Sequence, residues 1–374
     1  MKRNLFLICV WLMIGLFAAA FAQITPKAVW AKDGMLINDT PGNTSQQNPQ
    51  LIPDGKNNFI IVWEDGRSGY YDIYAQKIDS AGKIIWTKDG VVACSAKGNQ
   101  NFPQLASDMA GGAIIVWQDY HRGNADIFAQ RIDSNGNILW GNLGIAISQA
   151  SAGQFAPQII SDGNGGAIIA WHDYREGMGE DVFAQRVNAD GKILWQENGV
   201  PISTAAGTQW YPKIVTDNAG GAVITWTDGR LSSSDNNIFA QRVDKNGKVL
   251  WETNGLSVCS AANNQASPGI ISLSDGVIIT WHDARAKGND IYAQKISFAG
   301  KSLWIKDGAE ICTVAYAQEN PSLSPDGAGG AIVVWTDHRN EQNNIFAQRI
   351  LSNGKLAWQA DGRRVNESNR EQRS

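Results

Sequence analysis

Three series of residues, two of tryptophan and one of proline, recur in register along the chain, and this periodicity constrains the fold more than any other feature. Tryptophans repeat every 54 or 55 residues, and a second tryptophan series and a proline series keep nearly the same period. The first series is Trp63, Trp117, Trp171, Trp226, Trp281 and Trp335. The second is Trp86, Trp140, Trp195, Trp251, Trp304 and Trp358. The prolines are Pro49, Pro103, Pro157, Pro212, Pro268 and Pro321. Such self-similarity predicts six copies of one structural unit.

Each copy is expected to form four short antiparallel strands. In the second copy we expect them at 103–106, 113–117, 126–132 and 137–140. The connections at 107–112 and 133–136 contain Gly-Gly and Asn-Gly, which supply the positive φ that tight hairpin turns need. Nothing between the strands is long enough for a helix, so the unit is predicted to be an antiparallel meander.

The second strand of each copy is apolar at consecutive positions, as at 60–63 and 331–335, so both of its faces must be covered. Radial packing of blades around an axis achieves this for every copy. The fold is therefore predicted to be all-β, a six-bladed β-propeller of four-stranded antiparallel blades. Residues 30–34 repeat the outer-strand motif once more, which leaves seven blades as the alternative.

The domain organisation follows from these repeats. Lys2 and Arg3 precede an apolar run, and small residues follow it, which predicts a signal peptide at 1–22. One propeller domain is expected at 23–365, with an N-terminal closing strand at 27–46 and a polar tail at 366–374. The repeats are placed at about 47–101, 102–155, 156–210, 211–266, 267–319 and 320–365.

Two stretches resemble known families. The segment 129–140 and the Gly-Lys…Trp segments at 191–195, 247–251, 300–304 and 354–358 resemble the tryptophan-docking repeat of quinoprotein-type propellers. That resemblance implies that each tryptophan docks on the next blade, and it does not extend to quinone chemistry. The cassette 161–185 resembles repeats of secreted and surface bacterial proteins that use type IX secretion, and its Ser-Asp…Gly…Trp order resembles, more weakly, the Asp-box of sialidase-like propellers.

Charge and cysteine content narrow the possible partners. Loss of Lys2 and Arg3 changes the net charge from −4 to 30 − 36 = −6, and no basic stripe indicates nucleic acid or an anionic membrane. Cys94, Cys259 and Cys312 occupy one slot in different copies, too far apart for a disulfide, and are expected to be small buried side chains. The histidines lie in separate copies, so no metal site and no cofactor are expected.

Two charges recur after each first-series tryptophan. The predicted carboxylate and guanidinium ring is Asp65, Arg67, Asp119, Arg122, Asp173, Arg175, Asp228, Arg230, Asp283, Arg285, Asp337 and Arg339. We interpret each Asp as pairing with its own Arg to fix a loop; a ring that binds a polyvalent ligand is the alternative. The repeated glutamines are expected to be satisfied inside the blades, at Gln76, Gln130, Gln185, Gln241, Gln294 and Gln348.

Aromatic residues that break the repeat are the candidate ligand-binding residues. Phe102, Phe155, Trp210 and Tyr211 stand just before the repeated prolines and are predicted to cluster near the axis, where they suit a sugar ring or an apolar peptide side chain. The alternative is that they only plug the channel.

Because nearly every acid is repeated sixfold, the sequence predicts no catalytic residue and no enzyme. The leading hypothesis is a non-catalytic secreted or cell-surface module, with the periplasm also possible, that binds an extracellular protein or polysaccharide. It is expected to be a monomer without a membrane span after signal cleavage. The alternatives are a sialidase-like glycoside hydrolase and a multivalent lectin.

Overall fold

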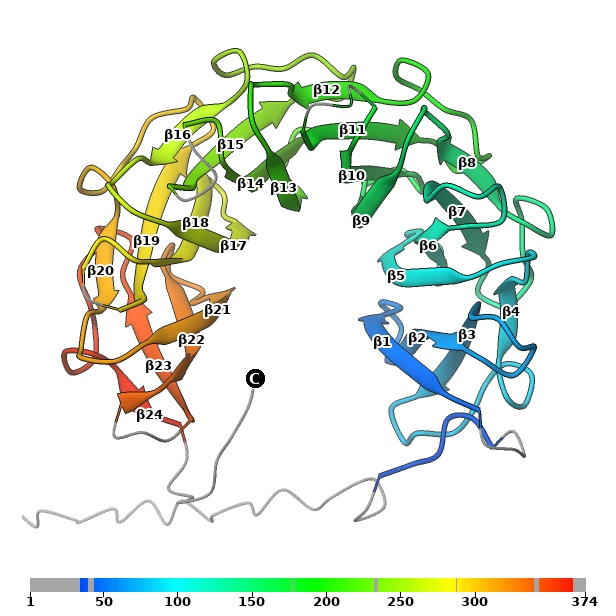
Figure 1. Cartoon of the computed structure of the whole chain (residues 1–374). Coiled ribbons are helices and arrows are strands. Elements are labelled where there is room, and N and C mark those ends of the chain that lie inside the picture. Colours follow the sequence, from blue (N-terminus) through cyan, green and yellow to red (C-terminus); the bar gives the residue numbers. More distant parts are fainter. Residues whose placement is uncertain are drawn as a thin grey trace, which may run out of the picture. The chain divides into compact units, whose positions relative to one another are not determined.

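The computed structural model describes residues 34–39, 44–175, 177, 179–231, 235–286, 288–339 and 343–365. These residues form six four-stranded antiparallel sheets, each ordered as an uninterrupted meander (Figure 1). The predicted signal peptide, the polar tail and parts of the closing strand lie outside the described residues. The fold is an all-β, six-bladed β-propeller, as the sequence predicted.

The strands follow one another in chain order, four to a sheet. The first sheet contains β1 (Gln46–Pro53), β2 (Asn58–Asp65), β3 (Asp72–Asp79) and β4 (Val91–Cys94). The second contains β5 (Gln100–Ser107), β6 (Ala113–Asp119), β7 (Asp126–Ile132) and β8 (Ile145–Ser148). The third contains β9 (Gln154–Ser161), β10 (Ala167–Asp173), β11 (Asp181–Val187) and β12 (Val200–Ser203).

The remaining three sheets repeat the pattern. The fourth contains β13 (Gln209–Thr216), β14 (Ala222–Asp228), β15 (Asn237–Val243) and β16 (Leu256–Cys259). The fifth contains β17 (Gln265–Ser272), β18 (Gly276–Asp283), β19 (Asp290–Ser297) and β20 (Ala309–Cys312). The sixth contains β21 (Gln318–Pro325), β22 (Ala331–Asp337), β23 (Asn344–Ile350) and β24 (Arg363–Arg364).

The turn between the first two strands of a sheet is built by an aspartate and a glycine. In the second sheet the Asp108 carboxylate accepts the N–H groups of Ala110 and Gly112, at 2.9 and 2.7 Å. A Cβ on Gly112 would lie 2.1 Å from the Ile132 carbonyl oxygen of the adjoining strand. Only glycine allows that close approach, which explains the repeated Asp…Gly-Gly signal.

The predicted fourth strand was wrong. In the second sheet it lies at Ile145–Ser148 and not at 137–140, where only an isolated bridge joins Ile132 to Ile138. The backbone N–H of Trp140 donates to the Gln130 side chain, 2.8 Å away, and so leaves the ladder. The chain then turns at Gly144, which has a φ of +72°. Glycine is needed there because a Cβ would lie 2.4 Å from the Ala129 carbonyl oxygen.

The core lies between the sheets. Five hydrophobic clusters each combine two consecutive sheets, and in each the tryptophan of the later sheet's second strand packs with residues of the earlier sheet. These indoles are buried: Trp117, Trp171, Trp226, Trp281 and Trp335. Both faces of the apolar second strands are covered in this way, as for β6, whose residues are all buried. Among the described residues no such cluster combines the first and last sheets, so their predicted closing contact stays a prediction.

Residues 36–39 contact the first sheet. The end of the fourth strand of one sheet contacts the following sheet in the same way. Asn38 donates to the Asp65 carboxylate at 2.9 Å, and the backbone N–H of Asp39 donates to the Asp89 carboxylate at 2.8 Å. The second contact matches that of Gln149, which follows β8 and donates to a side chain of the third sheet. Asn38 and Asp39 therefore contact the first sheet.

Candidate functional site

The repeated aspartates and arginines form closed pairs in five sheets. The N···O distances are 2.5 Å for Arg67–Asp65, 2.5 Å for Arg175–Asp173, 2.7 Å for Arg230–Asp228, 2.5 Å for Arg285–Asp283 and 2.6 Å for Arg339–Asp337. All five carboxylates are buried. Each arginine also lies over an aromatic ring of the third strand of its sheet, 3.7 to 3.9 Å from the ring centroid.

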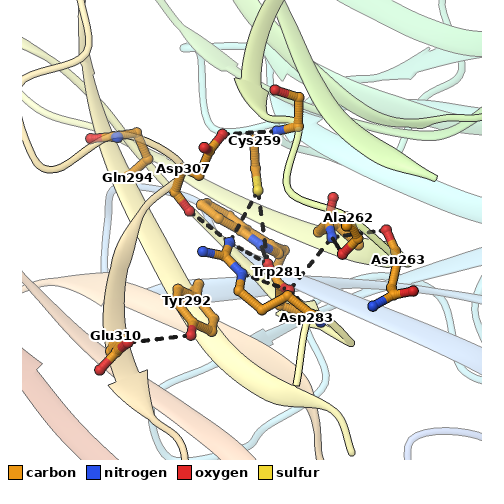
Figure 2. A network of polar contacts seen from close by, with 12 residues as sticks. Cys259, Ala262, Asn263, Trp281, Asp283, Tyr292, Gln294, Asp307 and Glu310 are labelled. Carbon is orange, nitrogen blue, oxygen red and sulfur yellow. Dashed lines mark hydrogen bonds and ion pairs between the residues drawn. The ribbon is translucent and has the colours of Figure 1, made fainter. Parts of the chain in front are cut away.

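The fifth sheet shows how completely such a pair is satisfied (Figure 2). Asp283 accepts the Trp281 indole N–H at 2.8 Å, in addition to two bonds from the Arg285 guanidinium and one from the Arg285 backbone N–H. Arg285 further donates to the Asp307 carbonyl oxygen at 2.7 Å and lies over the Tyr292 ring. A carboxylate with this many donors, 0% exposed, has no open side for a ligand. The geometry favours the interpretation that the pairs fix loops.

The second sheet departs from the predicted pairing. Asp119 pairs with His121, whose Nδ1 lies 2.5 Å away, while Arg122 is exposed one position later. His121 also packs edge-on against Phe128, where the other sheets place an arginine on an aromatic ring. Histidine thus occupies the position of the guanidinium, and the substitution leaves Arg122 outside the predicted ring.

The repeated glutamines are buried inside the sheets and use both ends of their amides. In the third sheet the Gln185 side chain donates to the Gln196 carbonyl oxygen at 2.6 Å and accepts the Trp195 backbone N–H at 3.0 Å. The equivalent bonds occur in the other five sheets. These amides hold the second tryptophan in place and take no part in a site.

The three cysteines of the described residues are free and buried, each at the end of a fourth strand. Burial raises the pKa of the Cys94, Cys259 and Cys312 thiols to about 12. Their thiolate forms are therefore disfavoured, so none of them is a candidate nucleophile. No group of three or more His, Cys, Asp or Glu side chains in the described part of the chain could hold a metal ion. The same part contains no helix long and apolar enough to span a bilayer.

Three of the four predicted aromatic residues line one pocket. Phe102, Phe155 and Tyr211 contribute to a pocket of about 930 Å³ over the second to fourth sheets. Trp210 does not line it and lies partly buried near Gly229. The other lining side chains are Gln104, Gln118, Tyr120, Asn124, Ala152, Ala156, Pro157, Gln158, His172, Tyr174 and Glu180.

A backbone bulge explains why Tyr211 and not Trp210 lines the pocket. The pairing of β13 with β14 shifts register between Trp210 and Lys213, and Tyr211 has φ +53°. Phe102 lies in the equivalent bulge of β5 and has a φ of +54°. The side chains at these positions are left exposed, 60% for Tyr211 and 51% for Phe102, which is unusual for large rings.

The third sheet contributes a polar group of three side chains to this pocket. The Tyr174 hydroxyl donates to the Glu180 carboxylate, and His172 Nε2 lies 3.7 Å from the same carboxylate oxygen. His172 Nδ1 accepts the Tyr211 backbone N–H at 3.4 Å. Burial lowers the pKa of His172 to about 4, so the ring is neutral at pH 7 with its proton on Nε2, facing Glu180.

Tyr174 is protonated at neutral pH, since desolvation and the hydrogen bond to Glu180 raise its pKa to about 12. The Phe155 ring packs edge-on against Tyr174, at a centroid distance of 5.5 Å, and stacks on His172 at 5.8 Å. A hydroxyl with an adjacent carboxylate base, beside exposed aromatic walls, is an arrangement that can perform nucleophilic or acid–base chemistry on a sugar.

The sequence analysis did not single out Tyr174 or Glu180, although Glu180 is an acid at a position that holds no acid in any other copy. The positions equivalent to Glu180 hold Tyr71, Ala125, Asn236, Asn289 and Asn343. Those equivalent to Tyr174 hold Gly66, Tyr120, Gly229, Ala284 and His338. Searching the variable loops for an acid that occurs in one copy only would have found Glu180.

No family model and no curated protein matches the chain. Solved structures do match. The α-L-arabinanase of Penicillium chrysogenum, complexed with arabinobiose, is 11% identical, with 69% of this chain and 80% of that chain covered and a TM-score of 0.43. A thermostable family-43 glycoside hydrolase is 11% identical over 91% and 98%, with a TM-score of 0.41. An α-L-arabinofuranosidase of Fusarium graminearum is 12% identical over 84% and 96%, with a TM-score of 0.43. At identities of 11% and 12%, the similarity to these structures concerns the fold alone.

This comparison contradicts the prediction of a non-catalytic binding module and of a chain that is not an enzyme, because these solved structures are glycoside hydrolases. The sequence-based argument weighed the sixfold repeated acids and did not consider Glu180, whose position holds an acid in one copy only. With no family model matched, the resemblances to type IX-exported repeats and to quinoprotein tryptophan-docking repeats stay predictions.

Proposed function

We propose that the chain is a glycoside hydrolase whose sugar site is the pocket of the second to fourth sheets, with Tyr174 as nucleophile and Glu180 as its base. The hydrogen bond from the Tyr174 hydroxyl to the Glu180 carboxylate, inside a pocket with aromatic walls, carries this proposal. It is argued from these side chains and not from the likeness to other folds.

The walls suit a sugar ring. Phe102, Phe155 and Tyr211 offer aromatic faces in a hollow of about 930 Å³, which is ample for more than one sugar residue. The apolar CH face of a pyranose or furanose can cover these rings, and the amides of Gln104, Gln118, Asn124 and Gln158 can hydrogen-bond its hydroxyls. Burying the exposed rings would favour binding.

The chemistry needs one bond to form and one to break in each of two steps. The Tyr174 oxygen attacks the anomeric carbon while its proton passes to Glu180; the glycosidic C–O bond breaks, and the departing alcohol, which leaves from the opposite face, takes its proton from water. Water then attacks the glycosyl-tyrosine and loses its proton to solvent, the bond between the sugar and the Tyr174 oxygen breaks, and that oxygen regains its proton from Glu180. A tyrosine nucleophile with a base is an established variant of the two-carboxylate scheme. The neutral His172 ring faces Glu180 and helps to orient it.

We also propose that the protein acts outside the cytoplasm, on a polysaccharide. The signal-peptide pattern at 1–22 supports this location, and the open aromatic pocket supports a chain-like substrate.

The test is hydrolysis of a panel of aryl glycosides, including arabinofuranosides, xylosides and sialosides. We expect activity on at least one member. Glu180→Gln should lower kcat by about 10²- to 10⁴-fold, the range for loss of general base catalysis. Tyr174→Phe should lower it at least as much, because the nucleophile is removed.

The repeat provides a matched control in Tyr120. It lines the same pocket and is equivalent to Tyr174, but its hydroxyl accepts from the Gln118 amide, at 3.3 Å, and has no carboxylate partner among the described residues. Tyr120→Phe should leave kcat within a few-fold of the original protein. If Tyr120→Phe and Tyr174→Phe behaved alike, or no member of the panel were cleaved, the assignment of Tyr174 and Glu180 would be wrong.

A further inference from the structure

A second hollow adjoins the pocket. It has a volume of about 620 Å³ and is lined by residues of the first strands β9, β13, β17 and β21. Gln158 and Tyr211 line both hollows, so the two share a wall. A ligand longer than one sugar residue, held in the pocket, can therefore extend along Tyr211 into the second hollow.

Among the described residues, Lys213 is the only charged side chain that lines this second hollow. It is accessible to solvent there, and no ion pair or hydrogen bond of its ammonium group occurs among the described residues. Glu180, the acidic side chain in the lining of the pocket, lines the first hollow and not the second. The walls of the hollow nevertheless displace part of the water around the Lys213 ammonium group, and this desolvation lowers the pKa of Lys213.

The position of Lys213 also breaks the repeat. Directly after the repeated proline, the first three copies have Gln50, Gln104 and Gln158, and the last two have Gly269 and Ser322. The fourth copy alone places a cation here, facing a hollow that Gly269 and Ser322 also line. An unpaired ammonium in a neutral, partly desolvated hollow attracts an anionic group more strongly than one on an open surface.

We propose that the second hollow is a subsite for a sugar that carries a carboxylate, and that Lys213 binds this carboxylate. The substrate class would then be an acidic polysaccharide with uronic acid residues next to the sugar held in the pocket. Ser267, Asn320 and Ser322 line the same hollow and can hydrogen-bond the hydroxyl groups of that residue. This inference specifies the substrate class of the proposed function. It rests on that function only in placing the uronic acid next to a sugar that is held in the pocket.

Binding to paired oligosaccharides tests it without requiring turnover. Oligogalacturonate and its fully methyl-esterified form have the same chain and differ in charge. Their affinities are measured by calorimetry with the Glu180→Gln protein, so that cleavage does not interfere. We expect oligogalacturonate to bind on the order of tenfold more tightly than the ester, the effect of one hydrogen bond to a charged group.

Lys213→Gln is the decisive variant, because glutamine occupies this position in three other copies and should not disturb the fold. It should abolish the preference for oligogalacturonate and leave binding of the ester unchanged. Lys192→Gln, in an exposed turn of the third sheet, is the control for overall charge. Equal affinities for the two oligosaccharides, or a preference that survives in Lys213→Gln, would overturn the subsite. A lost preference without glycosidase activity in the unmodified protein would uphold the subsite and reject the proposed function.

Discussion

At the scale of single residues, Asp290 is a buried acid in an unfavourable place. It begins β19, is 3% exposed, and has the Asp283 and Glu310 carboxylates nearby. Desolvation and those two charges raise its pKa to about 6. The equivalent positions of the fourth and sixth sheets hold Asn237 and Asn344, which fit without a charge.

Asp290→Asn is therefore expected to stabilise the protein at pH 7. A raised folded-state pKa means that the stabilising contribution of the acid is present below its unfolded pKa of about 3.8 and is lost as the pH rises through 6. The variant should gain about 1–3 kcal/mol in free energy of unfolding at pH 7 and little at pH 4. Denaturant titrations at both pH values measure this. The exposed Asp190→Asn is the control, and a gain independent of pH would contradict the explanation.

The site was predictable from the sequence only in part, for a reason that lies in individual residues. Phe102, Phe155 and Tyr211 were found because they break the repeat beside a proline. Trp210 is excluded from the pocket because a bulge shifts the register of β13. The periodicity of the sequence does not reveal such a bulge. Tyr174 and Glu180 lie at the two ends of the connection between β10 and β11, and the length of that connection does not determine that their side chains meet.

At the scale of elements, the second tryptophan series joins each sheet to the next. The indole N–H of Trp195 donates to the Lys245 carbonyl oxygen of the fourth sheet at 3.1 Å, and the same contact recurs for Trp86, Trp140, Trp251 and Trp304. A Cβ on Gly247 would lie 2.9 Å from the Trp195 ring. Glycine is thus required in that turn, both by this contact and by its φ of +85°.

Trp195→Ala is expected to cost about 3–5 kcal/mol in free energy of unfolding, the range for loss of a buried large ring. Gly247→Ala should also destabilise, because it introduces strain and pushes on the indole. The control is Leu194→Ala, since that neighbouring side chain is 42% exposed and should change stability little. Chemical denaturation compares the three. A Trp195→Ala protein as stable as the control would mean that the indole contact does not hold the sheets together.

Of the four strands in each sheet, the sequence predicted three at nearly the right positions. The apolar second and third strands have both faces covered, so their composition identifies them. The fourth was misplaced because the tryptophan that marks the repeat belongs to the connection and not to the strand. The true strand, such as β8, has only four residues, too few for a recognisable pattern.

At the scale of the whole molecule, the sheets share their cores. The first sheet contributes Ile60 and Val62 to the cluster that contains Trp117, and the fifth contributes Ile278 to the cluster that contains Trp335. The number and order of sheets were predictable, because each repeat marks one sheet. The contact expected between the first and last sheets was not predictable in this way. Trp63 belongs to none of the five clusters and Val334 is only partly buried, so the local sequence pattern does not indicate which residues cover these two side chains.

Shared cores predict cooperative unfolding, and the buried cysteines can report it. Cys94 belongs to the cluster between the first and second sheets, and Cys312 to that between the fifth and sixth. Loss of one sheet uncovers the apolar face of its neighbour, and burial of that face is the main term that holds the neighbour folded. The disturbance should therefore spread across all six sheets.

Two single-cysteine proteins separate the two ends of the molecule. Serine occupies the cysteine position at Ser148 and Ser203, so Cys→Ser changes there should be tolerated. One protein keeps Cys94 and the other keeps Cys312, and labelling with a thiol reagent is followed against denaturant. We expect one midpoint for both, coincident with loss of tryptophan fluorescence. An earlier midpoint for Cys94 would instead show that the first sheet unfolds alone, and would contradict cooperative unfolding of the six sheets.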